Sequence, residues 1–146
     1  MGKGLEPFAR FLGDWEGTSE SVAGTFHVAK RFQWLVPDSW LLEQTVTMHT
    51  ESGQEMARTA LLYTYDPNLA AVLADELRLS GVRQRLFLHS GDHGATWEVR
   101  SQPGGEAEAM FTTTLFTGDE WRADSFQRDA GGGWRQVEHM ELQRKR

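Results

Sequence analysis

The sequence contains no cysteine among its 146 residues. This absence excludes disulfide frameworks, thiolate metal sites and cysteine nucleophiles. It is also typical of proteins in a reducing compartment, and we therefore predict a cytoplasmic location. No apolar run approaches the length of a membrane span, and no charged, apolar and small-residue series predicts a signal peptide.

Positive charge is also scarce, because 15 lysines and arginines stand against 21 aspartates and glutamates, a formal net charge of −6. A field of this sign repels nucleic acid on average, so we expect no nucleic-acid partner. The one tight basic cluster in the sequence is Arg144-Lys145-Arg146. Its position at the terminus favours a solvated tail over a binding patch.

Turn-forming residues recur at a nearly constant spacing. Glycine supplies positive φ, and proline, aspartate and asparagine preset or mimic turns. Nine such signals separate ten segments: Ala23-Gly24, Pro37-Asp38, Ser52-Gly53, Asp66-Pro67-Asn68, Ser80-Gly81, Gly91-Asp92, Pro103-Gly104-Gly105, Gly118-Asp119 and Gly131-Gly132-Gly133. No linker or low-complexity stretch interrupts the series, so we predict a single domain over residues 1–146.

Most segments alternate apolar and polar side chains, the period of a strand with one buried face. In residues 26–36 the apolar set is Phe26, Val28, Phe32, Trp34 and Val36, and Lys30 interrupts it. Consecutive strands joined by short turns form an antiparallel meander, and closing the meander removes its exposed edges. The predicted fold is therefore all-β, a ten-stranded up-and-down antiparallel barrel.

Two segments depart from this alternation. Leu5, Phe8, Phe11 and Leu12 fall at helical spacing and predict a short N-terminal helix that plugs one end of the barrel. Residues 69–79 fit both a strand and a helix by their apolar pattern. The regular spacing of the turns favours a strand there.

Short motifs at both ends and in the middle of the chain resemble known barrel families. Residues 11–17, Phe-Leu-Gly-Asp-Trp-Glu-Gly, resemble the L-x-G-x-W-x-G opening shared by nitrobindin-like proteins and a bacterial calycin-like family of unknown function. Tyr65-Asp66-Pro67 resembles the Y-D-P turn of the second family, and residues 118–145 are similar to its closing hairpin. The resemblance implies a ten-stranded calycin-like barrel, related to lipocalins and fatty-acid-binding proteins.

The resemblance also implies an alternative function, haem binding. Nitrobindin-like barrels hold haem through a histidine on the last strand, and His139 matches that position, so it would be the axial metal ligand. Two features depart from the pattern. Glu141 stands where nitrobindins tend to carry a second histidine, and no basic pair is evident for the haem propionates.

The last predicted strand offers two alternative faces to the barrel interior. One face carries Arg135, Val137, His139 and Glu141, and the other carries Trp134, Met140 and Leu142. If the first face points inward, a cation, an imidazole and a carboxylate line one wall of the cavity. If the second points inward, as the burial of apolar side chains favours, the polar residues are solvated.

Other polar groups have simpler interpretations. The stripe Glu43, Thr45, Thr47 and His49, like His27 with Arg31, is typical of the wet face of a sheet. His89 and His93 flank turn residues and lack the helix that would bring them to one metal. Asp75 and Glu76 are strand neighbours that point to opposite faces, so they do not form a hydrolase pair.

The sequence therefore predicts a protein that binds a small hydrophobic or amphipathic molecule inside the barrel without catalysing a reaction. A small enzyme or a structural module whose barrel is filled by side chains stays open as an alternative. The six tryptophans are chiefly expected to pack, with some lining a pocket for a flat or apolar ligand. The predicted ligand-binding residues are Trp34, Trp40, Glu43, Arg135, His139 and Glu141. The sequence does not distinguish a monomer from a homodimer.

Overall fold

The computed structural model describes residues 5–78, 81–90, 96–100 and 110–145. A six-residue 3₁₀-helix, η1 (Glu6–Phe11), precedes ten strands. They are β1 (Gly13–Ser21), β2 (Gly24–Val36), β3 (Trp40–His49), β4 (Glu55–Asp66), β5 (Ala71–Arg78), β6 (Gly81–Ser90), β7 (Thr96–Arg100), β8 (Met110–Thr117), β9 (Glu120–Arg128) and β10 (Trp134–Arg144). Residues 69–79, which fitted two structures by sequence, thus contain a strand over their described part.

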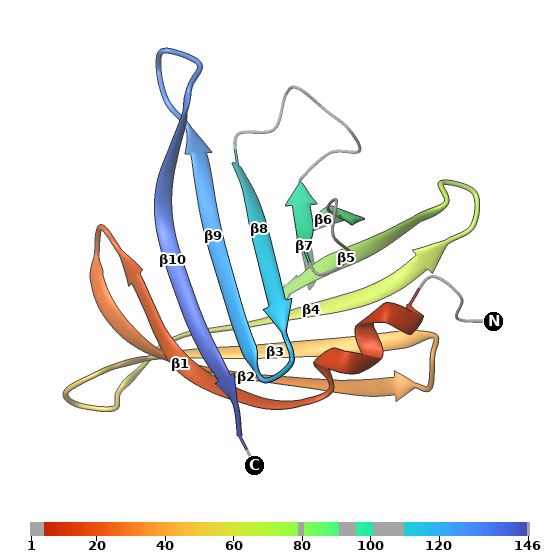
Figure 1. Cartoon of the computed structure of the whole chain (residues 1–146), viewed down its shortest axis with the longest axis horizontal. Coiled ribbons are helices and arrows are strands. Elements are labelled where there is room, and N and C mark those ends of the chain that lie inside the picture. Colours follow the sequence, from red (N-terminus) through yellow and green to blue (C-terminus); the bar gives the residue numbers. More distant parts are fainter. Residues whose placement is uncertain (1–4, 79–80, 91–95, 101–109, 146) are drawn as a thin grey trace.

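Each strand pairs antiparallel with its neighbours along the chain, and β1 also pairs with β10 (Figure 1). The order around the sheet is β1-β10-β9-β8-β7-β6-β5-β4-β3-β2, which returns to its start. The prediction of an all-β chain with an antiparallel sheet curled into a barrel-like fold is confirmed. No helix of the described residues is long and apolar enough to cross a membrane.

The seam between β1 and β10 depends on a glycine. Gly17 lies opposite Leu142, and a Cβ added at Gly17 would meet the carbonyl oxygen of Glu141 at 1.9 Å. No real side chain tolerates backbone at that distance, so only glycine lets the two strands approach this closely. The glycine that ends the W-x-G motif is therefore required by the closure of the sheet.

The helix η1 lies across one end of the barrel (Figure 1). Phe8 and Phe11 of the helix and the preceding Leu5 are each at most 3% exposed. The indole nitrogen of Trp15 donates to the carbonyl oxygen of Phe11 at 2.9 Å and ties the helix to β1. The short apolar stretch before the first strand therefore covers one end of the core, as its helical spacing predicted.

The basic C-terminal cluster is not a solvated tail, so that interpretation was wrong for its described residues. Arg144 donates to the carbonyl oxygens of Arg10 and Leu12, and its guanidinium lies 4.3 Å from the centre of the Trp15 ring. The backbone nitrogen of Lys145 donates to the carbonyl oxygen of Asp14 at 2.8 Å. The C-terminal end of β10 thus fastens η1, because the arginine satisfies carbonyl groups that a helix end leaves open.

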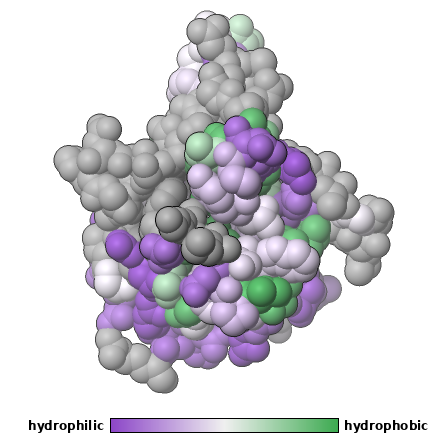
Figure 2. All heavy atoms as spheres, turned by 90° about the vertical axis from the view of Figure 1, so that its right-hand side faces the viewer, coloured by the Kyte–Doolittle hydropathy of each residue, from purple (hydrophilic) through white to green (hydrophobic). Residues whose placement is uncertain are grey.

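Several large apolar side chains remain exposed near the turns at the helix end of the barrel. They are Leu35, Val36 and Trp40 at the β2–β3 turn and Leu69 at the β4–β5 turn. Figure 2 views the molecule from this side, where apolar areas alternate with hydrophilic ones. Scattered exposure of this kind is normal for a protein surface.

Candidate functional site

The inner faces of the strands line a cavity of about 500 Å³ that is partly open to solvent. This volume lies within the range of small-molecule sites. Its apolar lining consists of Phe8, Phe11, Leu61, Leu86, Leu88, Trp121, Ala123 and Met140. Its polar lining consists of Lys30, Glu43, Thr45, Thr47, Thr59, Tyr63, Glu76, Thr114, Ser125 and Glu138. The cavity therefore combines an aromatic and aliphatic surface with many hydrogen-bonding groups.

The register of the sheet brings the polar side chains together. Lys30 on β2 pairs with Thr45 on β3, and Thr45 pairs with Thr59 on β4. Because side chains two residues apart share a strand face, Glu43 points to the same side as Thr45. Three neighbouring strands thus place one cation, one carboxylate and two hydroxyls on the same stretch of the inner wall.

Lys30 and Glu43 form a buried ion pair on this wall. The Nζ of Lys30 lies 2.9 Å from Oε2 of Glu43, and the two side chains are only 10% and 6% exposed. Nζ also donates to the hydroxyl of Thr45 at 2.9 Å. Two buried charges are tolerated only when each is paired and hydrogen-bonded, and this arrangement meets both conditions.

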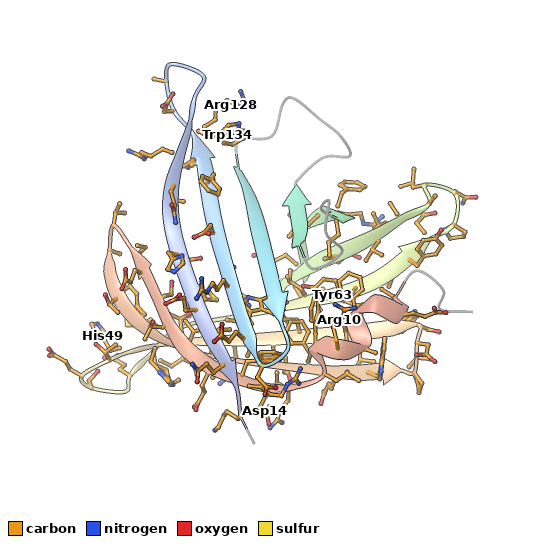
Figure 3. The ribbon with its side chains drawn as sticks, viewed as in Figure 1. Arg10, Asp14, His49, Tyr63, Arg128 and Trp134 are labelled. Carbon is orange, nitrogen blue, oxygen red and sulfur yellow. The ribbon has the colours of Figure 1, made fainter. Side chains whose placement is uncertain are left out.

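Tyr63 completes the cluster from β4. Its hydroxyl donates to Oε1 of Glu43 at 2.6 Å, so both carboxylate oxygens are engaged. Complete burial raises the pKa of Tyr63 well above its ordinary value, and the negative charge and hydrogen bond of Glu43 raise it further. Tyr63 therefore stays a neutral hydrogen-bond donor. In Figure 3 it lies next to η1, whereas His49 lies at the far end of β3.

The end of the cavity nearest η1 is aromatic. The ring of Phe11 lies 4.9 Å from that of Trp121 in an edge-to-face contact and 5.6 Å from that of Phe32. Phe8 contacts Tyr63 with ring centroids 5.6 Å apart. Such pairs stabilise a packed surface beyond the area they bury. They form an apolar floor under the cavity.

Of the six predicted ligand-binding residues, Glu43 alone lines this cavity. Trp34 is partly buried and packs against the core without being part of the cavity lining. Trp40 is 50% exposed at the start of β3. Their predicted positions in the wall are therefore corrected. Trp40 lies three residues before Glu43, so the side chains of these two residues point to opposite faces of β3 and could not both line the cavity.

Arg135, His139 and Glu141 also lie outside the cavity lining, because the opposite face of β10 points inward. Met140 and Leu142 are 9% and 2% exposed, whereas Arg135 and Glu141 are exposed. The burial of apolar side chains decides between the two faces. Arg135, His139 and Glu141 therefore lie on the outside of the barrel.

His139 is held on that outer surface. Its Nδ1 lies 2.5 Å from Oδ1 of Asp124 on β9, and its Nε2 lies 3.6 Å from Oε1 of Glu141. No histidine appears among the described residues that line the cavity. These positions do not fit a haem held inside the barrel by His139, and they correct the predicted metal ligand. No described group of three or more metal-binding side chains is present.

The polar stripe of β3 was interpreted as facing outward, and most of it faces inward. Glu43, Thr45 and Thr47 line the cavity, so their interpretation as a wet outer face was wrong. His49, at the end of the strand, is exposed. A ligand-sized cavity can keep polar side chains inside because it does not have to be filled by apolar ones.

Other expectations for polar residues agree with the structure where it describes them. His27 lies 3.5 Å from Glu16, and Arg31 lies 2.7 Å from Asp14, in both cases as exposed pairs. Asp75 pairs with Arg85 at 2.8 Å, while its neighbour Glu76 faces the cavity from the other side of β5. His93 and the side chain of His89 lie outside the described residues.

Lys30, Tyr63 and Glu138 are site residues that the sequence analysis did not assign. The signal for Lys30 was present, because it stands at an inward position within an alternating apolar set. Glu138 lies two residues before Met140 and therefore shares its face of the strand, so the alternation of β10 could have identified it. Tyr63 carries no local signal, since only the three-strand register brings it to Glu43.

The pair of His139 and Asp124 predicts a small pH dependence of stability. The hydrogen bond to Asp124 raises the pKa of His139. A raised pKa in the folded state stabilises the fold below the unfolded value, about 6.5, and the contribution is lost as pH rises through the folded pKa. Asp124→Asn should therefore cost more stability at pH 5.5 than at pH 8.5, by less than about 1 kcal/mol because the pair is partly exposed.

Urea unfolding at the two pH values checks this expectation. Asp14→Asn is the control, because the hydrogen bond from Arg31 lowers the pKa of Asp14 and no histidine takes part. Its cost should be the same at both pH values. An equal cost of Asp124→Asn at the two pH values would show that His139 gains no proton affinity from its partner.

Comparison with known proteins supports the fold. No protein-family model and no curated protein matches the chain. Among solved structures the chain is similar to the crystal structure of Rv2717c from M. tuberculosis, with a TM-score of 0.73 and 14% sequence identity. The match covers 99% of this chain and 98% of the other. At this identity the likeness concerns the fold alone, along nearly its whole length.

Proposed function

We propose that the chain is a calycin-like binding protein that holds one small, partly apolar molecule in its barrel. The observation that carries the proposal is the cavity of about 500 Å³, with an aromatic floor and a polar inner wall. A few oriented polar groups in an otherwise apolar container are the usual features of a ligand site. The cytoplasmic location stays a prediction from composition.

The contacts among Lys30, Glu43 and Tyr63 support a structural role for this part of the polar wall. Lys30, Glu43 and Tyr63 satisfy one another through contacts of 2.9 and 2.6 Å. A general base or nucleophile must reach the substrate with a free lone pair. Groups engaged in this way instead fix the shape and polarity of the wall.

Titration with N-phenylnaphthylamine, a neutral probe that fluoresces in apolar surroundings, tests the proposal. The probe should bind the wild type with saturation near one molecule per chain and quench tryptophan fluorescence, because Trp121 lines the cavity. Ala123→Phe should weaken binding at least about tenfold by filling space on the inner wall.

Ala29→Phe is the matched control, because Ala29 lies on the outer side of β2 beside an external groove. It should leave the affinity unchanged. Equal binding by the wild type and Ala123→Phe, with both variants folded by circular dichroism, would place the probe outside the barrel and contradict the proposal. Absence of any saturable binding would contradict it as well.

A further inference from the structure

The cavity has a direction, from an aromatic end to a carboxylate. Trp121 on β9 pairs with Leu142 on β10 at the end nearest η1, and Ser125 pairs with Glu138 further along the same two strands. Four residues of strand separate Leu142 from Glu138, a distance of about 13 Å. An elongated molecule with its apolar part on the aromatic floor would therefore carry its other end towards Glu138.

The positive charge among the described residues of the cavity wall is already matched. Lys30 lies 2.9 Å from Oε2 of Glu43 and donates its second hydrogen bond to Thr45. The remaining oxygen of Glu43 accepts from Tyr63. An anionic ligand would have to separate this buried pair before it could use the lysine, and breaking such a pair is costly.

Glu138 presents a different situation. Its side chain lines the cavity, and its Oε2 accepts a hydrogen bond from Ser19 at 2.8 Å. It takes part in no ion pair with any residue whose side chain the structure describes. A half-buried carboxylate without a cation favours a positively charged, hydrogen-bond-donating group and repels a negative one.

We infer that the cavity takes an amphipathic molecule with a cationic head, such as a primary ammonium. The head binds Glu138 and the apolar body lies against Phe11 and Trp121 at the other end. The inference rests on the proposed function and adds to it the chemical class of the ligand. It also separates this cavity from sites for anionic amphiphiles such as long-chain carboxylates.

Competition against N-phenylnaphthylamine with three ten-carbon amphiphiles tests the inference. At pH 7 decylamine is a cation, decanol is neutral and decanoate is an anion. Decylamine should displace the probe at a concentration about tenfold lower than decanol, the effect of one charge-assisted hydrogen bond, and decanoate should be the weakest. This comparison uses the wild-type protein and depends on no substitution.

Glu138→Gln removes the charge and keeps a side-chain oxygen for Ser19. It should reduce the decylamine preference over decanol to less than about twofold, because the charge-assisted bond is lost. Glu141→Gln is the matched control, since it makes the same charge change on the outer face of the same strand. The control should retain the full preference.

The outcomes separate the inference from the proposed function. If decanol or decanoate competes as well as decylamine, the inference is overturned while binding in the cavity stands. A preference that survives in Glu138→Gln, or disappears equally in Glu141→Gln, overturns it too. If the probe itself does not bind, the proposed function fails before the head group can be compared.

Discussion

Lys30→Met should lower the free energy of unfolding by about 3 kcal/mol, because it leaves the carboxylate of Glu43 buried without its cation. Methionine keeps most of the length of lysine, so the loss reports the charge and not a missing volume. Glu43 is 6% exposed and has little access to water that could replace the ammonium group. Urea unfolding followed by tryptophan fluorescence measures the change.

A double variant shows whether the loss belongs to the pair. Lys30→Met with Glu43→Gln should recover most of the stability, because replacing both partners of a buried pair is often nearly neutral. The amide oxygen of Gln at position 43 can still accept the hydrogen bond of Tyr63. Additive losses in the double variant would show that the two residues do not act as a pair.

Arg31→Met is the control for a charge change on the same strand. Arg31 follows Lys30 but points outward, where its side chain is 60% exposed and pairs with Asp14. Exposed pairs contribute about 0.2–1 kcal/mol, so the control should lose far less stability than Lys30→Met. Equal losses would contradict the inward position of Lys30.

Gly17→Ala should destabilise the protein by about 3 kcal/mol, the upper end of the cost of overpacking. The added methyl group would meet the carbonyl oxygen of Glu141 at 1.9 Å and the Cα of Leu142 at 2.8 Å. Both are backbone atoms, so β1 and β10 must separate to accept it. Chemical denaturation measures the loss, and slower or incomplete closure of the seam should appear as increased amide exchange in both strands.

Gly131→Ala is the matched control in the β9–β10 turn. Its added Cβ would meet Asp129 at 3.5 Å, an ordinary contact. The backbone nitrogen of residue 131 would keep its hydrogen bond to Asp129. Its effect should be within about 0.5 kcal/mol of zero. A Gly17→Ala variant as stable as this control would contradict the close approach of the two strands.

Much of the fold could be predicted from the sequence because turn chemistry is local. Glycine with positive φ stands at several of the predicted turns, including Gly24, Gly53 and Gly118. Gly53 and Gly118 lie between two strands in the structure, and Gly24 is the first residue of β2. Residues 69–79 were ambiguous by period alone, and the turns on either side were sufficient to decide for a strand.

The site was harder to predict, because a hollow barrel weakens the rule that connects polarity with position. Lys30, Glu43 and Thr45 are polar and face inward, whereas His139 and Glu141 are polar and face outward. Alternation shows which residues share a face, and it does not say which face is internal. On β10 the burial of Met140 shows which face is internal. On β3 only the pairing with neighbouring strands shows it.

A crystal structure of the protein with 10-bromodecylamine tests most directly whether the cavity is the binding site. Anomalous scattering locates the bromine. We expect a single bromine site inside the barrel beside Phe11 and Trp121, with the ammonium group within hydrogen-bonding distance of Glu138. A bromine on the outer surface, for example near Glu16 or Glu141, would contradict the claim that the cavity is the binding site.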